Sequence, residues 1–419
     1  MKKSIAPLFA LIWIVLFAGC SQAANSNQEG LPANPSPSVN PTPTAAPPPS
    51  QEPVDLIKER ISEMSVDEKI GQMVLVGLEG TTLQSDAKEM IERYRVGGFI
   101  LYKDNIDNAS QTVSLLNQLK EANAANKAPL WLSLDQEGGK VNRMPEQLKE
   151  LPTARAIGKV NNSEYTKRIG QAIGEELQAF GFNMDFAPVL DINSNPDNPV
   201  IGNRSFGADP DTVTQHGLEM MRAIQSKDVA AVVKHFPGHG DTSVDSHLEL
   251  PVVTKSLSEL KSFELLPFIE AVREDADAVM IAHLLIPKID NKYPASLSGK
   301  VITDLLRDEL AYDGVVITDD MTMGGITKHF GMGEAAVLTV QAGSDILLIG
   351  HEHSMQVEVL QALKKGVEEG ALTEDRLDQS VYRILKLKQK YHIEDEATAE
   401  VDVQAVNQII EAALDSGKS

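Results

Sequence analysis

The densest group of chemically reactive side chains lies between residues 234 and 247. The segment reads Lys234-His235-Phe236-Pro237-Gly238-His239-Gly240-Asp241-Thr242-Ser243-Val244-Asp245-Ser246-His247. Three histidines, two aspartates and a lysine within fourteen residues have little use in a hydrophobic core. An apolar run, Val229–Val233, leads directly into the segment, so we expect the polar residues at the end of a buried strand. Charged groups at the carboxyl end of a strand are typical of an α/β active site.

Other polar residues follow other apolar runs in the same way. If those runs are parallel strands, their carboxyl ends meet on one face, and acids, bases and cations converge there. Carboxylates ringed by arginine and lysine, without a phosphate-type glycine loop, favour a hydroxyl-rich substrate. The residues are Asp135, Arg143, Asp185, Asp191, Asn193, Arg204, His283, Asp319, Asp320, His351 and His353.

Each of these residues also has an ordinary structural interpretation when it is taken alone. Arg143 fits a surface helix, Asp135 fits the cap of a following helix, and Arg204 fits the partner of a structural acid. Only their common location favours a binding site.

A zinc site is the main alternative for the histidines. His235 and His239 have the spacing of two zinc ligands on one helical turn. Pro237 and Gly238 stand between them and disfavour such a turn, and no His-Glu-x-x-His pattern accompanies them. The sequence therefore predicts no metal and no other cofactor.

The elements that must position these residues alternate between helix and strand. Eight short apolar runs, rich in leucine and β-branched residues, are separated by amphipathic stretches, as expected of strands buried on both faces. Eight such repeats predict a single (β/α)8 barrel, with a doubly wound open sheet as the alternative. The runs are Met73–Val76, Gly98–Tyr102, Leu130–Leu134, Met184–Leu190, Val229–Val233, Ala278–Ala282, Gly314–Ile317 and Asp345–Ile349.

Composition limits the class of protein and its partners. Hydrophobic residues make up 42% of the 419-residue chain and charged residues 23%, which is ordinary for a globular protein. The formal net charge of −22 argues against nucleic acid as a partner, because binding phosphates needs a positive field. A neutral sugar is compatible with that charge, and so is a small anion in a local basic pocket.

The first twenty residues predict export and lipidation. A basic start is followed by an apolar stretch, residues 5–19, that is too short for a comfortable membrane span. The sequence Leu16-Phe17-Ala18-Gly19-Cys20 resembles the lipobox of bacterial lipoproteins, with phenylalanine where leucine is usual. We expect cleavage before Cys20 and a lipid on its sulfur. An ordinary secretory signal is the alternative. Cys20 is the single cysteine, so no internal disulfide is possible.

Residues 21–53 are expected to form an extended tether. Nine of the chain's 22 prolines fall there, with too few apolar residues to offset the entropy of ordering. Together with a lipid, the tether would hold a catalytic body outside the cytoplasm, close to the cell wall. The expected parts are a signal peptide (1–19), a lipidated linker (20–53), a barrel (54–395) and an acidic C-terminal helix or tail (396–419).

The motifs together resemble the bacterial β-N-acetylglucosaminidases of glycoside hydrolase family 3. The resemblance runs from about residue 55 to 392. Its Asp-Ser-His element distinguishes this branch from β-glucosidases of the family, which take their acid/base from a second domain. The resemblance therefore implies a barrel that is complete alone. The residues that carry it are Asp135–Gly139, Lys234–Gly240, Asp245–His247 and Thr318–Met321.

The resemblance also implies a role for each matching residue. Asp319 would be the nucleophile, although strand alternation alone does not choose between Asp319 and Asp320. His247 would be the general acid/base, with Asp245 as its partner. The positions that match sugar-binding residues are Asp135, Arg143, Arg204, Lys234 and His235.

These roles are chemically coherent. A retaining glycosidase needs a nucleophile on one side of the anomeric carbon and a proton donor on the other. A histidine with an unperturbed pKa near 6.5 can donate and remove protons near neutral pH. Asp245 would orient the His247 imidazole and stabilise its protonated form. Gly238 and Gly240 would let the loop bring His247 over bound substrate.

The expected activity is exo-removal of terminal, non-reducing N-acetylglucosamine from peptidoglycan-derived fragments. The expected partners are an N-acetylglucosamine-containing oligosaccharide or muropeptide and, through the N-terminal lipid, a bacterial membrane. Phosphate could replace water as acceptor, because a neutral histidine repels anions less than glutamate does. The sequence also leaves open a β-glucosidase, a sugar-binding lipoprotein of a transport system and a non-catalytic wall-binding protein.

Overall fold

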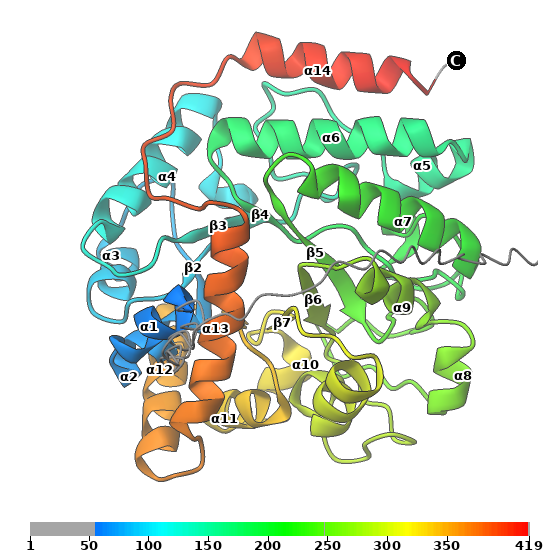
Figure 1. The fold of residues 1–419 in the computed structure, drawn as a ribbon. Helices are drawn as coiled ribbons and strands as arrows, with labels where there is room; N and C mark the ends of the chain where they lie inside the picture. Colours follow the sequence, from blue (N-terminus) through cyan, green and yellow to red (C-terminus); the bar gives the residue numbers. More distant parts are fainter. Residues whose placement is uncertain (1–54, 247, 418–419) are drawn as a thin grey trace, which may run out of the picture. The chain divides into compact units, whose positions relative to one another are not determined.

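The computed structural model describes residues 55–246 and 248–417. Eight parallel strands form its centre, and helices surround them (Figure 1). Every strand residue is buried, because the strands consist mainly of apolar side chains that pack both inside the ring and against the helices. The strands are β1 (Val74–Gly77), β2 (Gly98–Ile100), β3 (Trp131–Leu134), β4 (Met184–Asp185), β5 (Ala230–Phe236), β6 (Ala278–Ile281), β7 (Val315–Thr318) and β8 (Leu347–Ile349).

The strands close into a barrel. Consecutive strands pair from β1 to β7, and β1 also pairs with β8. The ring is completed by an isolated parallel bridge between Ile317 and Ile346. There the Thr318 amide donates to the Ile346 carbonyl at 3.1 Å. The predicted (β/α)8 barrel is confirmed, and the open doubly wound sheet is wrong.

Each predicted apolar run overlaps one strand, but some bounds differ. Regular pairing of β4 stops at Asp185, well before the predicted end at Leu190. Pro188 has no amide hydrogen to donate, and pairing resumes only as a bridge between Val189 and Lys234. Conversely, β5 continues to Phe236, three residues beyond the predicted run.

Fourteen α-helices lie in the part of the chain that the structure describes. A capping box of Ser65 and Glu68 begins α2. None of the described helices is long and apolar enough to cross a membrane. The helices are α1 (Leu56–Ser62), α2 (Val66–Gln72), α3 (Ser85–Glu92), α4 (Ala109–Asn123), α5 (Ala154–Val160), α6 (Ser163–Phe180), α7 (Pro210–Gln225), α8 (Leu257–Lys261), α9 (Leu266–Arg273), α10 (Gly324–Thr327), α11 (Met332–Ala342), α12 (His353–Glu368), α13 (Glu374–Lys390) and α14 (Val403–Asp415).

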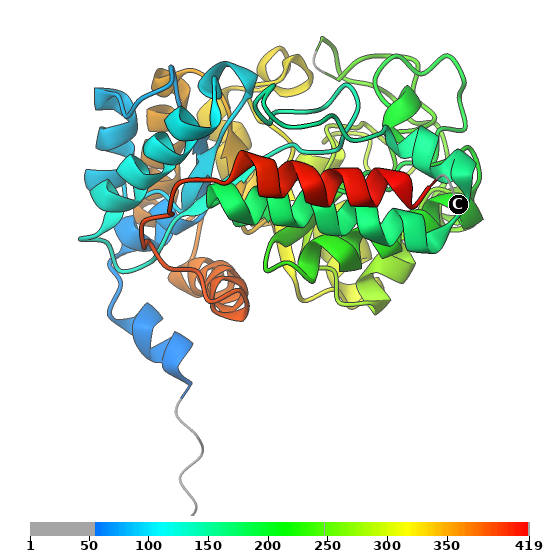
Figure 2. The ribbon, with the colours of Figure 1, turned by 90° about the horizontal axis from the view of Figure 1, so that it is seen from above.

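The C-terminal helix α14 packs along α6 (Figures 1 and 2). It also contacts the loop between β3 and α5. The Asn407 side chain accepts a hydrogen bond from the Lys149 amide at 2.8 Å and donates to the Gln147 carbonyl at 2.8 Å. Lys149 forms an ion pair with Glu411 at 2.6 Å. Helix α14 therefore braces the loop that carries Asp135 and Arg143.

Several predicted features lie outside the described residues. They are the signal peptide, Cys20, the linker 20–53 and the acid/base candidate His247. They stay predictions.

Candidate active site

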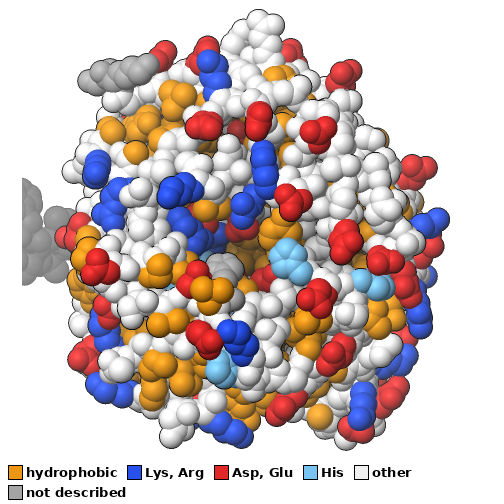
Figure 3. Space-filling model, turned by 180° about the vertical axis from the view of Figure 1, so that it is seen from behind, with side chains coloured by type: hydrophobic (Ala, Val, Ile, Leu, Met, Phe, Trp, Pro, Cys, Tyr) orange, Lys and Arg blue, Asp and Glu red, His pale blue; other side chains and the backbone are white. Residues whose placement is uncertain are grey.

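A cavity of about 410 Å³ opens at the carboxyl ends of the strands. Figure 3 shows one face of the molecule hollowed near its centre, with charged side chains around the hollow. Six of the residues with a predicted catalytic or sugar-binding role line the cavity together. They come from β5 and from the segments that follow β3, β4 and β7, and are Asp135, Arg143, Arg204, Lys234, His235 and Asp319.

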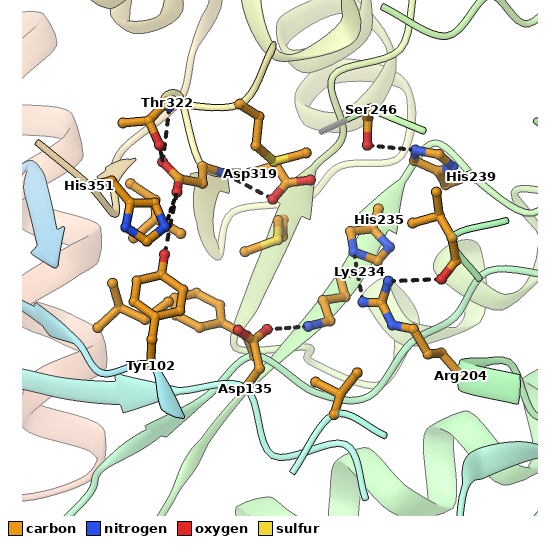
Figure 4. A pocket seen from close by; sticks show the side chains of 18 of the residues that line it. Tyr102, Asp135, Arg204, Lys234, His235, His239, Ser246, Asp319, Thr322 and His351 are labelled. Carbon is orange, nitrogen blue, oxygen red and sulfur yellow. Dashed lines mark hydrogen bonds and ion pairs between the residues drawn. The ribbon is translucent and has the colours of Figure 1, made fainter. Parts of the chain in front are cut away.

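Lys234 lies at the closed end of the cavity. It comes from β5, is buried, and its Nζ lies 2.5 Å from Asp135 Oδ1 and 2.7 Å from Glu137 Oε1. Burial alone would lower the pKa of Lys234, but the two carboxylates more than offset it and raise the pKa. The lysine is therefore a fixed cation that holds Asp135 at the edge of the cavity (Figure 4).

Glu137 joins Lys234 to the loop after β4. Its two carboxylate oxygens accept hydrogen bonds from Arg204 Nε at 2.8 Å and Nη2 at 2.7 Å. Burial would raise the pKa of Glu137, but Arg204 and Lys234 hold it well below its ordinary value. The bidentate pair fixes the plane of the Arg204 guanidinium beside the cavity.

His235 is oriented by an acid behind it. Its Nδ1 lies 2.6 Å from Asp191 Oδ2, and the His239 amide donates to Asp191 Oδ1 at 2.7 Å. Burial would raise the pKa of Asp191, but His235 outweighs burial and the pKa is lowered. The bond to Asp191 Oδ2 engages Nδ1 and leaves Nε2 as the nitrogen that faces Arg204, at 3.4 Å.

The two aspartates after β7 have different surroundings, although both line the cavity. Asp320 is buried, and its Oδ1 accepts hydrogen bonds from the Thr322 amide (2.9 Å), the Thr322 hydroxyl (2.8 Å) and the Gly350 amide (2.9 Å). Asp319 Oδ1 accepts one from the Asp320 amide at 2.9 Å. Asp320 thus holds two loops together, whereas Asp319 is the half-buried carboxylate beside the cavity.

Arg143 lies on the loop after β3, and that loop is anchored by buried polar groups around Gln136. Gln136 accepts a hydrogen bond from the Arg143 amide at 3.0 Å and donates from its side chain to Glu176 at 2.7 Å. The Gln136 amide donates to Asp185 at 2.9 Å. Burial raises the pKa of Glu176 to about 8 and also raises that of Asp185. The Arg143 guanidinium lies 3.7 Å from Asp135.

Asp245 lies beside a neighbouring cavity of about 500 Å³, which shares Val141, Val200 and Arg204 with the first. The next residue, Ser246, lines the first cavity, and its hydroxyl lies 3.0 Å from His239 Nε2. The predicted partner of Asp245, His247, is not among the described residues.

Tyr102 and His351 stand at the ends of β2 and β8, on the other side of Asp319 from Arg204 (Figure 4). Their rings stack with centroids 4.6 Å apart and an angle of 22° between the planes. Burial, followed by the charge of Asp320, raises the pKa of the Tyr102 phenol well above its ordinary value. Tyr102 therefore stays a neutral hydrogen-bond donor.

His235 and His239, the pair with zinc-ligand spacing, form hydrogen bonds to other side chains. The rings of His235 and His239 lie edge to face, 6.0 Å between centroids. His235 contacts Asp191, and His239 contacts Ser246 and Thr242. Across residues 55–246 and 248–417, no group of three or more metal-ligating side chains is gathered.

Several residues that shape the site have no specific role predicted from the sequence. They include the carboxylates that fix the cations, and the aromatic pair. Arg204 and Lys234 are two cations at one site, and buried cations need an acid as counter-charge. That requirement could have identified Glu137 from the sequence. Tyr102 and His351 were detectable because they follow strands. The residues without a predicted role are Tyr102, Glu137, Asp191, His239, Ser246 and His351.

Comparisons with known proteins agree on one family. The family model described as "Glycosyl hydrolase family 3 N terminal domain" matches residues 65–387. "Beta-hexosaminidase A" from Pseudoalteromonas piscicida is 38% identical over 334 residues, which cover 74% of this chain and 56% of that protein. "Beta-hexosaminidase LpqI" from Mycobacterium tuberculosis is 34% identical over 333 residues, covering 78% of this chain and 83% of that protein. The chain thus spans little more than half the length of the first relative.

Solved structures give the same result. A glycoside hydrolase family 3 β-N-acetylglucosaminidase from a Paenibacillus species has a TM-score of 0.79 and 41% identity, covering 84% of this chain and 68% of that one. A β-glucoside phosphorylase has a TM-score of 0.76 at 23% identity, covering 86% of this chain and 66% of that one. The second likeness is one of fold alone.

Proposed function

Because the chain belongs to glycoside hydrolase family 3, we propose that it is a retaining exo-β-N-acetylglucosaminidase. It removes terminal, non-reducing N-acetylglucosamine from peptidoglycan-derived fragments. The observation that carries the proposal is a half-buried carboxylate, Asp319, in a cavity that is also lined by fixed hydrogen-bond donors and acceptors.

The sugar is held by its hydroxyl groups. Asp135 accepts hydrogen bonds from neighbouring hydroxyls, while Lys234, Arg204 and Arg143 donate to hydroxyl and carbonyl oxygens. Lys234 and Arg204 are already locked by Asp135 and Glu137, so binding loses little side-chain entropy. The cavity ends at these buried groups, which favours a terminal sugar over an internal one.

Two displacements at the anomeric carbon complete the reaction. In the first, Asp319 forms an ester bond to that carbon as its bond to the aglycone oxygen breaks, and His247 gives its proton to that oxygen. In the second, His247 takes a proton from water, whose oxygen attacks the same carbon and releases Asp319. The sugar therefore leaves with its original configuration.

Sequence motifs and neighbouring contacts support the acid/base assignment. Asp245, Ser246 and His247 form the Asp-Ser-His element, and Ser246 lines the cavity beside His239. We assign Asp245 as the residue that stabilises the protonated His247 imidazole. The lipobox-like sequence around Cys20 supports placement on the outer side of a bacterial membrane, close to the wall.

Hydrolysis of matched chromogenic substrates tests the proposal. The purified protein should cleave an aryl β-N-acetylglucosaminide with a far higher kcat/KM than the matching β-glucoside, and chelators should not change the rate. Proton NMR should show the β-anomer as the first product. Faster cleavage of the glucoside would replace the proposal with a β-glucosidase.

The natural acceptor and substrate are tested by product analysis. Wall-derived disaccharides should yield free N-acetylglucosamine at the same rate with and without inorganic phosphate. Accumulation of N-acetylglucosamine 1-phosphate would identify a phosphorylase instead.

A further inference from the structure

We propose that the stacked pair of Tyr102 and His351 is the binding surface for the sugar unit on the leaving-group side of the cleaved bond. This inference rests on the proposed function and specifies the substrate of the same site. It requires a pyranose ring, and not merely any alcohol, next to the terminal N-acetylglucosamine.

The pair lies at the open end of the cavity. The His351 side chain is 60% exposed, whereas those of Lys234 and Glu137, at the closed end, are 2% and 4% exposed. An exo-acting enzyme places the terminal sugar at the closed end, so the next unit must lie at the open end. Tyr102 stacks on one face of the His351 imidazole, and more than half of the His351 side chain stays exposed.

The surface is rigid before any ligand binds. The Tyr102 amide donates to Asn105 at 2.8 Å, and its hydroxyl donates to Asp320 Oδ2 at 3.4 Å. His351 Nε2 lies 3.8 Å from the same oxygen. Asp320 in turn is fixed by Thr322 and by the amide of Gly350, next to His351. A preorganised aromatic face loses little entropy when a ligand stacks on it.

One side of the cavity carries charged groups that suit sugar hydroxyls, and the other carries an aromatic pair that suits the face of a second sugar ring. Charged groups around Arg204 and Lys234 suit the hydroxyls of the held sugar, whereas one face of a pyranose is a patch of C–H groups that packs on an aromatic ring. Figure 4 shows Tyr102 and His351 across Asp319 from Arg204. The neighbouring cavity, lined by Lys140 and Asp245 among others, has no aromatic side chain in its described lining.

The test compares two substrates whose leaving groups are both alkoxides. Methyl β-N-acetylglucosaminide has no ring beyond the cleaved bond, and N,N′-diacetylchitobiose has one. In His351→Ala, the ratio of kcat/KM for the disaccharide to kcat/KM for the methyl glycoside should fall about fivefold to tenfold, the loss expected for one stacking contact. His351→Phe keeps a stacking face without the contact to Asp320 and should restore the ratio.

Two variants serve as controls. His353→Ala removes a histidine that pairs with Glu89 at 3.3 Å and does not line the cavity, and it should leave the ratio unchanged. Lys140→Ala tests the neighbouring cavity. A selective loss of disaccharide cleavage in Lys140→Ala but not in His351→Ala would overturn the inference. An unchanged ratio in His351→Ala, or a Phe variant as impaired as Ala, would overturn it too. Failure of the wild-type protein to cleave either substrate would instead reject the proposed function.

Discussion

Two adjacent carboxylates after β7 illustrate how much a residue's role depends on its partners. Asp320 accepts three hydrogen bonds on one oxygen and one from Tyr102 on the other. Its lone pairs are used to hold the chain. Asp319 accepts a bond from the next amide and faces the cavity. Asp319 is also the less buried of the two, and it is the carboxylate that we propose as the nucleophile.

We expect Asp319→Asn to lower kcat by roughly four orders of magnitude, because an amide oxygen is a poor nucleophile. Its melting temperature should stay close to that of the wild type. Asp320→Asn is the matched control, because it keeps an acceptor oxygen for Thr322 and Gly350 and should retain most of the turnover. Steady-state kinetics and thermal melts would decide. The reverse result would show that Asp320 is the nucleophile.

His247→Ala should slow the cleavage of substrates with poor leaving groups far more than that of substrates with good ones. A 2,4-dinitrophenyl aglycone leaves without a proton, so its first step should be nearly normal in this variant. The covalent intermediate should then accumulate, because the second step also needs a base. Rapid-quench burst kinetics would measure both steps. Asp245→Ala should change them in the same direction. Equal slowing of glycosylation for both leaving groups would argue against proton donation by His247.

The amino-acid sequence indicates which residues face the site, but not which residues form hydrogen bonds with them. Lys234, Asp135 and Asp319 were predictable because each stands at or after the end of an apolar run. The Asp191 partner of His235 was not, because the two residues are 44 positions apart and meet only once β4 and β5 pair. The role of His247 was available only through resemblance.

At the scale of elements, the loop after β3 depends on an acid in α6. Glu176 is buried, its pKa is about 8 and its Oε1 accepts a hydrogen bond from Gln136. Between the unfolded pKa near 4.5 and the folded value, the native state holds a proton that the unfolded state has lost. The protein is therefore stabilised at low pH by this group, and that stability is lost as the pH rises towards 8.

Glu176→Gln should remove this pH dependence. The amide keeps an oxygen for Gln136 and has no charge to bury, so the variant should gain stability relative to the wild type by about 4 kcal/mol between pH 5 and pH 9. Denaturant unfolding at several pH values would measure the difference. A difference that does not change with pH would mean that Glu176 is ionised in the folded protein.

Removing α14 should weaken sugar binding as well as stability. A chain that ends at residue 401 lacks Asn407 and Glu411, which hold Gln147 and Lys149 in the loop after β3. We expect KM to rise a few-fold, because Asp135 and Arg143 lie on that loop. Asn407→Ala should show a smaller effect of the same kind. Kinetics on an aryl N-acetylglucosaminide would test this, and a lower melting temperature with unchanged KM would limit α14 to a structural role.

The existence of the strands was predictable, whereas their ends were not. Runs of buried apolar residues identify a strand whatever its neighbours are. An end depends on which amides find partners, as the early stop of β4 before Pro188 shows. The brace by α14 was equally hidden, since an amphipathic pattern predicts a helix but not the surface on which it packs.

For the whole molecule, the predicted lipid on Cys20 gives a direct test of location. In the native host, the wild-type protein should fractionate with membranes, whereas Cys20→Ser should move to the soluble extracytoplasmic fraction. Turnover of a small soluble substrate should be equal for the two, because the cavity lies in the barrel. Membrane association of Cys20→Ser equal to that of the wild type would refute lipid anchoring.

The junction of β7 and β8 has a further consequence. It is closed by the bridge between Ile317 and Ile346, and the Asp320 carboxylate adds a bond from Gly350 across it. A closed ring of parallel strands presents no open edge to another chain. If substitution of Asp320 by an apolar residue separated the two strands, two rows of unpaired backbone groups would become available to neighbouring molecules. The Asp320 carboxylate therefore adds one bond to the backbone bonds that keep these two rows paired with each other and away from neighbouring molecules.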